Sequence, residues 1–230
     1  MLTKRVPERL SGVILDLDGV ILDTMKQWNR LGRVFLRECG IEPKTDLLDR
    51  LATMTLEDSP AFLHDEYHVK KSVREIETIL KTRVKSFYSP YPRVKVGALA
   101  TIKTFKQLNV KVALATTTPK EFAETALELS SMRMFFDGLF SCADMGFSEG
   151  KTSARIYDVA LAFLNTPLEE TIVVEDSFYA IQTAKNAGYY VVGFEDEEEF
   201  RNKKEILNVV DHYVENHDEL QKWLVRCFSI

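Results

Sequence analysis

Cysteine is scarce in this chain, and basic residues do not outnumber acidic ones. The 230 residues include three cysteines, Cys39, Cys142 and Cys227, which are scattered and odd in number. This usage argues against a disulfide framework or a zinc site and is typical of a reducing compartment. The formal net charge of -5 argues against nonspecific binding of nucleic acid.

Long apolar runs are also missing. No stretch approaches the roughly 20 residues that a membrane-spanning helix needs. Segment 1–10 is interrupted by charged side chains and lacks the apolar core of a secretory signal. Internal repeats and low-complexity segments are absent from the sequence. We therefore expect a cytoplasmic protein that is monomeric and has neither a membrane nor a nucleic-acid partner.

What the chain does contain is an alternation of short apolar runs and amphipathic segments. Apolar spacing typical of helices lies between the runs, and Gly188 follows one such helix as a stop. The acidic run 195–199 is typical of a solvated loop or a helix start. This alternation predicts an α/β fold, a Rossmann-like three-layer core with a mostly parallel sheet. The predicted strands are Val13–Leu15, Val110–Ala115, Gly138–Cys142, Thr171–Val174, Tyr190–Gly193 and His212–Val214.

The region after the first strand has a different pattern. Apolar residues at helical spacing predict a helix over 25–39, which Asp23 or Thr24 caps and Gly40 ends. Residues 41–90 lack a strand run and predict further helices, and the Pro-rich segment 88–92 is a hinge. We therefore expect a core formed by residues 1–22 and 91–230. A helical cap domain, residues 23–90, is inserted after the first strand.

Two aspartates follow the first predicted strand, one residue apart. Because side chains alternate along a strand, Asp16 and Asp18 project to the same side. Their mutual repulsion is resolved by a bound cation or a shared proton. The alternative is a solvated, Asp-rich turn, so partners elsewhere in the chain decide between the two.

Polar side chains also follow other predicted strands. Thr116 and Thr117 come after one strand, Glu175 and Asp176 after another, and Lys151 lies in a loop before a helix. In open α/β sheets, ligands bind beyond the carboxyl ends of the strands, where these groups meet. Carboxylates can attack phosphorus, move protons and hold Mg²⁺, while lysine and hydroxyl groups can hold phosphoryl oxygens. The set predicts phosphoryl transfer at one edge of the sheet.

Four motifs, in this order, resemble those of the haloacid dehalogenase-like superfamily of phosphatases and mutases. They are Asp16-Leu17-Asp18-Gly19-Val20, the strand ending in Thr116, Gly150-Lys151-Thr152, and Val173-Val174-Glu175-Asp176-Ser177. The resemblance covers nearly the whole chain, and the helical insert resembles the small cap of the β-phosphoglucomutase-like branch. It implies a Mg²⁺-dependent enzyme that acts on a small phosphorylated metabolite.

The same resemblance implies roles for individual residues. Asp16 is the nucleophile, and Asp18 is the general acid and base. Thr116, Thr117 and Lys151 bind the phosphoryl group.

The resemblance also implies a metal site. Its ligands are Asp16, Asp18 through its backbone carbonyl, Glu175 and Asp176. Glu175 has a second interpretation, in which it supports the other ligands without touching the metal.

Departures from the β-phosphoglucomutase pattern narrow the function. Trp28 stands where those enzymes have a histidine, and 53–56 replaces a stretch whose arginine grips a second phosphate. Lys120 and Arg155 either add positive charge near the site or lie on the surface. We therefore expect a phosphatase with an aspartyl-phosphate intermediate, and a phosphomutase is the alternative.

A phosphorylatable switch protein without turnover is the third interpretation. Signalling receivers use the same residue types, but their acidic pair comes first and the phosphorylated aspartate later. Here the order is reversed, and a helical insert is present. This order favours an enzyme that hydrolyses the aspartyl phosphate.

Overall fold

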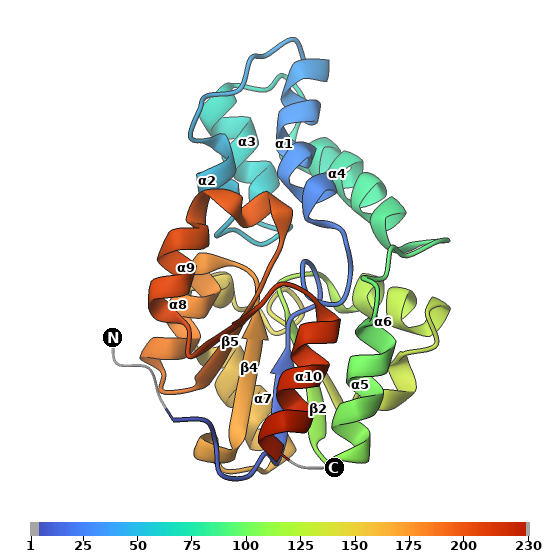
Figure 1. Cartoon of the computed structure of the whole chain (residues 1–230). Helices are drawn as coiled ribbons and strands as arrows, with labels where there is room; N and C mark the ends of the chain where they lie inside the picture. Colours follow the sequence, from blue (N-terminus) through green and yellow to red (C-terminus); the bar gives the residue numbers. More distant parts are fainter. Residues whose placement is uncertain (1–4, 229–230) are drawn as a thin grey trace.

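The computed structural model of the chain describes residues 5–228 (Figure 1). Helices, short 3₁₀ turns and six strands alternate along it. In chain order the elements are β1 (Gly12–Leu15), α1 (Met25–Glu38), α2 (Leu47–Leu51), α3 (Ser59–Tyr67), α4 (Val73–Tyr88), α5 (Ala98–Gln107), β2 (Lys111–Thr116), α6 (Lys120–Leu129), η1 (Arg133–Phe135), β3 (Gly138–Ser141), η2 (Gly150–Thr152), α7 (Arg155–Leu164), η3 (Leu168–Glu170), β4 (Thr171–Glu175), α8 (Phe178–Asn186), β5 (Tyr190–Phe194), η4 (Glu197–Asn202), α9 (Lys203–Val209), β6 (His212–Val214) and α10 (His217–Phe228).

The six strands form one sheet in the order β3-β2-β1-β4-β5-β6, and every neighbouring pair is parallel. The predicted α/β fold is confirmed. Strand β1 is central, and Leu15 at its end is level with Leu114 of β2 and Val174 of β4. The residues that follow these strands therefore emerge side by side at one edge of the sheet.

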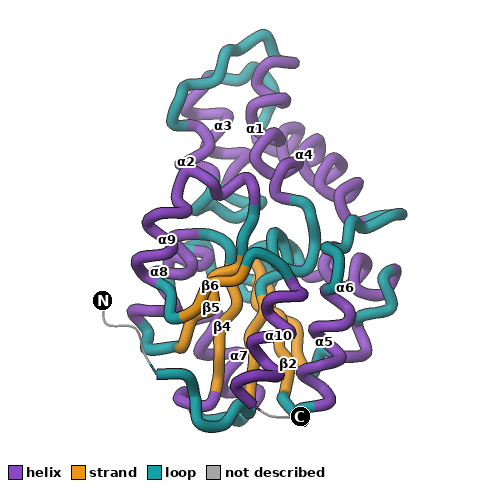
Figure 2. The backbone as a smooth tube through the Cα atoms, in the orientation of Figure 1, coloured by secondary structure: helices purple, strands orange, loops and turns teal. Residues whose placement is uncertain are grey.

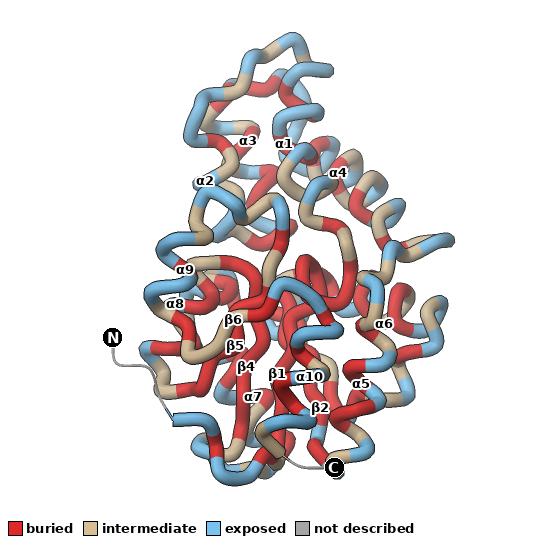
Figure 3. Tube along the Cα trace, viewed as in Figure 1, coloured by how far each residue is buried: buried red, intermediate tan, exposed pale blue. Residues whose placement is uncertain are grey.

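Helices cover both faces of the sheet. Val13 and Leu15 pack on the face that α5, α6 and α10 cover, whereas Ile14 packs on the face of α7, α8 and α9. This alternation follows from the period of two along a strand. Because both faces are buried, the strands read as unbroken apolar runs rather than as alternating ones. Figure 3 shows the buried backbone concentrated in the sheet and on the inner sides of the helices.

Four of the five helices between β1 and β2, namely α1 to α4, form a separate helical layer. Figures 1 and 2 place α1 to α4 together at one end of the molecule, away from α5 and α10. The segments entering and leaving this layer run side by side, since the amide of Asp23 donates to the carbonyl of Arg93 at 2.7 Å and that of Lys95 to the carbonyl of Ile21 at 2.9 Å. The layer is thus inserted through two adjacent, hydrogen-bonded linkers.

One local prediction is wrong, and one helix was not predicted. Thr24 occupies the N-cap position of α1, but its hydroxyl makes no capping hydrogen bond and donates to Asp18 instead, while Asp23 pairs with Arg93 at 2.6 Å. The acidic run continues into η4 and the unpredicted helix α9, where only Ile206 is fully buried. A single buried residue leaves too weak an apolar periodicity to predict that helix. Within residues 5–228, no helix combines the length and the apolar character needed to cross a membrane.

Candidate active site

A buried lysine joins two of the predicted carboxylates. Asp16 directly follows β1, and Glu175 ends β4, the neighbouring strand. The Nζ of Lys151, from η2, donates to Asp16 and to Oε1 of Glu175, the latter at 2.5 Å. Tyr157 of α7 also donates to that oxygen of Glu175, at 2.7 Å. Lys151 is 2% exposed, so its ammonium group is fully committed to this site.

Asp176 completes an acidic cluster. Carboxylate oxygens of Asp16, Glu175 and Asp176 all lie within 4.8 Å of one another. The Oδ2 atom of Asp176 is buried and has no hydrogen-bond partner. A buried carboxylate oxygen without a partner is costly unless a cation completes it. These residues therefore fit a hard cation such as Mg²⁺, which prefers carboxylate oxygens.

Glycine is required where the first motif passes this cluster. Gly19 has a φ of +92°, in the left-handed region that glycine adopts without steric cost. A Cβ atom built there would lie 2.0 Å from Oδ2 of Asp176. The absence of a side chain at Gly19 lets the loop after β1 close over the acidic cluster.

Asp18 has a different environment from Asp16. Three hydroxyl groups donate to its carboxylate: Thr24 and Tyr88 to Oδ1, and Thr118 to Oδ2. The bonds from Tyr88 and Thr118 are each 2.7 Å long. Asp16 is therefore held by the ammonium group of Lys151, and Asp18 is held by neutral hydroxyl donors. This difference suits two carboxylates with different chemical tasks.

The helical layer reaches Asp18 through one side chain. Tyr88 is the last residue of α4, and its ring is fully buried. Its hydroxyl accepts a hydrogen bond from Nε1 of Trp28, on α1, at 2.8 Å. The ring also stacks on Phe122 of α6, with centroids 6.0 Å apart and planes 3° from parallel. Tyr88 thus contacts α1, α6 and the loop after β1 at once.

Burial dominates the ionisation of the site. It raises the pKa of Asp16 despite the opposing Lys151, and it raises the pKa of Asp18, to which the charge of Asp16 adds. Burial also raises the pKa of Glu175 to about 7, with Lys151 again opposing. Burial, followed by the repulsion from Asp16 and Glu175, raises the pKa of Asp176 well above its usual range. Among residues 5–228, Lys151 is the lysine that pairs with the carboxylates of Asp16 and Glu175, and Asp176 lies beside them. The acidic groups therefore outnumber the basic one, and a bound cation would relieve this excess of negative charge.

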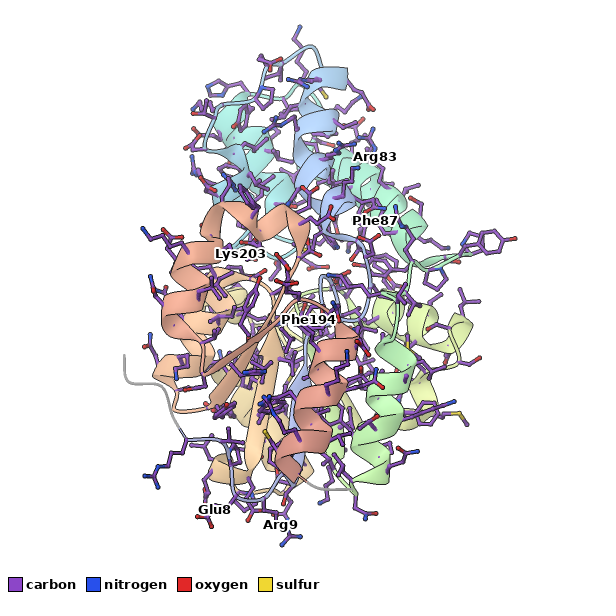
Figure 4. All side chains as sticks on the ribbon, in the orientation of Figure 1. Glu8, Arg9, Arg83, Phe87, Phe194 and Lys203 are labelled. Carbon is purple, nitrogen blue, oxygen red and sulfur yellow. The ribbon has the colours of Figure 1, made fainter. Side chains whose placement is uncertain are left out.

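A cavity of about 250 Å³ opens between these groups and the helical layer. Asp16, Asp18 and Lys151 line its floor, and residues of α1, α2, α3 and α4 line its walls. In Figure 4, the labelled Phe87 lies in the helical layer, and the labelled Phe194 lies at the end of β5. Five of the predicted residues thus line a space that can hold a small molecule, namely Asp16, Asp18, Thr117, Lys151 and Glu175.

Of the remaining residues that the sequence singled out, some line the cavity and others do not. Thr117 lines the cavity, whereas the hydroxyl of Thr116 is buried and accepts from the amide of Thr118 at 3.1 Å. Lys120 is half exposed and faces Glu124 at 3.9 Å. Arg155 pairs with Glu149 at 2.9 Å. Neither Lys120 nor Arg155 lines the cavity, so both are surface residues, as the second interpretation held.

The sequence did not identify the hydroxyl donors of Asp18. In the sequence, Thr118 is the last residue of the threonine run 116–118. The pattern favours Thr24 as a helix cap and places Tyr88 in the predicted hinge. Nothing in the spacing relates Tyr88 to Asp18, which lies 70 residues earlier. Such contacts depend on how the helical layer is placed on the core.

Comparison with known proteins adds independent findings. The family model for haloacid dehalogenase-like hydrolases matches residues 13–194. A phosphorylated carbohydrates phosphatase from Thermotoga maritima is 26% identical over 179 residues, which cover 78% of this chain and 82% of the relative. A pyrophosphatase from Halalkalibacterium halodurans is 25% identical over 229 residues, which cover 87% and 97% of the two chains.

A solved structure of similar fold is β-phosphoglucomutase from Clostridium difficile. Its TM-score is 0.76 at 18% identity, and the match covers 95% of this chain and 96% of that one. At this level of identity the likeness concerns the fold alone.

Proposed function

The chain belongs to the haloacid dehalogenase-like hydrolase family, and on that premise we propose that it is a Mg²⁺-dependent phosphatase. It hydrolyses a small phosphomonoester through an aspartyl-phosphate intermediate. The observation that carries this proposal is the environment of Asp16, a buried carboxylate that Lys151 holds at the floor of a cavity. Asp18, at the same floor, has a separate set of partners and is available for proton transfer.

In the first step, an oxygen of Asp16 attacks phosphorus, and the bond from phosphorus to the ester oxygen breaks. Asp18 gives its proton to that departing oxygen, which leaves as an alcohol. Lys151 and Thr117 hold the phosphoryl oxygens, so that the negative charge is neutralised during transfer.

In the second step, water attacks the phosphorus of the aspartyl phosphate. Asp18, now ionised, takes a proton from that water, and the phosphorus–oxygen bond to Asp16 breaks. Inorganic phosphate and the free carboxylate of Asp16 result, with Asp18 protonated again. The two aspartates thus return to their starting states.

Mg²⁺ would be held by Asp16 and Asp176, together with Glu175 and the backbone carbonyl of Asp18. The partnerless oxygen of Asp176 supports this assignment. The ion supplies positive charge that screens the repulsion between the nucleophile and the phosphate. Glu175 retains its alternative as a supporting group, because its Oε1 already accepts from Lys151 and Tyr157.

The domain division forms part of the proposal. Residues 1–22 and 91–230 are the catalytic core, and residues 23–90 are the cap. The hydrogen bonds between the two linkers, at Asp23 and Lys95, support a boundary at this place. A cap over the cavity would exclude water while the phosphoryl group moves to Asp16.

Hydrolysis is favoured over the phosphomutase alternative by the charges around the cavity. A mutase must grip a second phosphate, which arginine or lysine usually does. Among the described residues, Lys151 and Arg201 are the cations that line the cavity. Lys151 is already assigned to the phosphoryl group that moves to Asp16, and Arg201 is an exposed side chain that pairs with Asp49. No free cation is thus left for a second phosphate among residues 5–228.

The substitution Asp16→Asn tests the mechanism. It removes the attacking oxygen but keeps the size of the side chain, so we expect kcat to fall by at least about 10³-fold. Release of inorganic phosphate from a panel of phosphomonoesters is measured with Mg²⁺ and after chelation, and circular dichroism monitors the fold. Rapid quench of the wild-type enzyme should reveal a phosphoryl group on Asp16.

The matched control is Asp65→Asn, at an exposed position on α3, which should leave kcat unchanged. Turnover of Asp16→Asn at the wild-type rate would rule out the aspartyl-phosphate mechanism. An aspartyl phosphate that persists for hours in the wild type would instead favour the switch protein. Stimulation of turnover by a sugar bisphosphate would favour the mutase.

A further inference from the structure

The cavity extends from the catalytic floor into the interior of the helical layer. Its far walls come from all four helices and from the segment between α2 and α3. Six leucines contribute to these walls, and two of them, Leu48 and Leu51, are partly exposed; the six are Leu31, Leu48, Leu51, Leu56, Leu63 and Leu80. Leu63 and Leu80 are otherwise buried in the interior of the layer. A group bound opposite the phosphate therefore faces hydrocarbon.

Polar side chains of the layer that line the same cavity already have partners in the protein. Asn29 donates to Glu198, and Asp49 accepts from Arg201. The remaining ones are also engaged, namely Trp28 with Tyr88, Thr53 with the carbonyl of Arg50, Thr55 with Asp58, and Ser59 with the carbonyl of Leu56. A ligand rich in hydroxyl groups would therefore compete with these internal bonds for the hydrogen-bond donors of the layer.

An unpaired hydroxyl in a buried pocket is costly, whereas an alkyl or aryl group gains from leaving water. A pocket that cannot hydrogen-bond a substrate hydroxyl also gains nothing from its presence. The chemistry of the walls therefore selects for the carbon skeleton of the leaving group and against its hydroxyl groups.

We propose that the leaving group has an apolar body, so that the preferred substrates are alkyl or aryl phosphomonoesters rather than polyhydroxylated sugar phosphates. This inference rests on the proposed phosphatase activity at Asp16 and adds the class of alcohol that it releases. The phosphate lies at the floor beside Lys151, and the alkyl or aryl chain lies among the leucines of the helical layer.

Two matched pairs of phosphate esters test the proposal on the wild-type enzyme. The pairs are n-hexyl phosphate with sorbitol 6-phosphate, and n-propyl phosphate with glycerol 3-phosphate. In each pair the carbon chain has the same length and the phosphate is on a primary alcohol. Neighbouring hydroxyls make the polyol the better leaving group, so a preference for the alkyl ester must come from binding.

We expect kcat/KM for n-hexyl phosphate to exceed that for sorbitol 6-phosphate by about 100-fold. It should also exceed that for n-propyl phosphate by about tenfold, because the longer chain reaches more of the leucine wall. Phosphate release with Mg²⁺ is the measurement.

A pair of variants locates the effect. Leu51→Phe fills part of the cavity, and the ratio of kcat/KM for n-hexyl over n-propyl phosphate should fall about tenfold. Leu129→Phe, at an exposed leucine near the end of α6, should leave that ratio unchanged. The wild-type comparison stands by itself if Leu51→Phe does not fold.

The outcomes are distinguishable. Faster hydrolysis of sorbitol 6-phosphate than of n-hexyl phosphate would overturn the inference and leave the phosphatase standing. An unchanged ratio in Leu51→Phe would also overturn it, because the chain would then bind elsewhere. Release of phosphate from other phosphomonoesters of the panel but from neither alkyl ester would likewise overturn the inference, whereas release from no ester of the whole panel would overturn the phosphatase itself.

Discussion

Asp18 is held by hydroxyl groups from three different parts of the chain. Thr24 begins α1, Tyr88 ends α4, and Thr118 follows β2. Two of these groups belong to the ends of the helical layer, so the orientation of the proposed acid depends on where that layer sits. Tyr88 is the one that also contacts Trp28, and we regard it as a positioning residue for Asp18.

The substitution Tyr88→Phe tests this role. It removes one donor from Asp18 and the acceptor of the Trp28 N–H, while the ring that stacks on Phe122 is kept. Proton transfer matters for alkyl esters and much less for p-nitrophenyl phosphate, whose leaving group departs as an anion. We expect kcat/KM to fall about tenfold for an alkyl ester and less than about threefold for the nitrophenyl ester.

The control for this experiment is Tyr91→Phe. Tyr91 is 88% exposed, three residues beyond Tyr88, and should affect neither ester. An equal loss with both esters in Tyr88→Phe would show that Tyr88 has only a structural role.

At the residue scale, the sequence predicted the site residues that belong to short motifs. Asp16, Lys151, Glu175 and Asp176 come together because strands β1 and β4 end at the same edge. The partners of Asp18 could not be predicted in this way. They come from the ends of helices, and the position of a helix end depends on how the helical layer packs against the sheet and its helices.

At the scale of elements, the docking of α10 depends on its first residue. His217 is 1% exposed, and its Nε2 donates to the carbonyl of Val20 at 2.8 Å. A carbonyl only accepts, so this nitrogen carries the proton, and Nδ1 is left to accept from Thr101 of α5 at 3.1 Å. One neutral imidazole therefore ties α10 to α5 and to the loop after β1.

The pKa of His217 is lowered to about 4, mainly by burial; the bond to Val20 opposes this shift, and the charge of Lys95 adds to it. In the unfolded chain the pKa is near 6.5. As the pH falls below 6.5, the unfolded state therefore binds a proton before the folded state does. The contribution of His217 is complete above pH 6.5 and is lost between pH 6.5 and 4.

Between pH 7.5 and pH 5, we expect the free energy of unfolding of the wild type to fall by about 2 kcal/mol more than that of the variant His217→Gln. Glutamine can also donate to Val20 but does not titrate. Urea unfolding at the two pH values gives the difference, and the exposed His64→Gln serves as the control. Equal losses in the wild type and His217→Gln would contradict the assignment.

The elements themselves were predictable to differing degrees. Helix α4 buries Ile76, Leu80, Val84 and Tyr88 at regular spacing, and its sequence pattern was clear. Helix α9 buries only Ile206, and it forms because it packs against α8. A short helix whose stability comes from a neighbour leaves little periodicity in its own sequence.

At the scale of the whole molecule, the interior of the helical layer is continuous with one face of the sheet. Leu63 and Leu80 of the layer belong to the same apolar cluster as Leu15 and Val112 of the sheet. The stacked rings of Tyr88 and Phe122 lie across the boundary between the layer and α6. Because this apolar cluster joins the helical layer to the sheet beside the polar floor of the cavity, the proposed cap and core should unfold together.

The chain contains two tryptophans, and each reports one side of that boundary. Trp28 of α1 packs edge-on against Phe87 in the helical layer, and Trp223 of α10 stacks on Tyr190 of the core. In Trp223→Phe, the fluorescence of Trp28 follows the layer, and in Trp28→Phe, the fluorescence of Trp223 follows the core. We expect the urea midpoint of fluorescence to coincide with that of far-ultraviolet circular dichroism in both variants. If the Trp28 signal were lost at a lower urea concentration than the circular dichroism, the helical layer would unfold first, and the shared apolar cluster would not make the two parts cooperative.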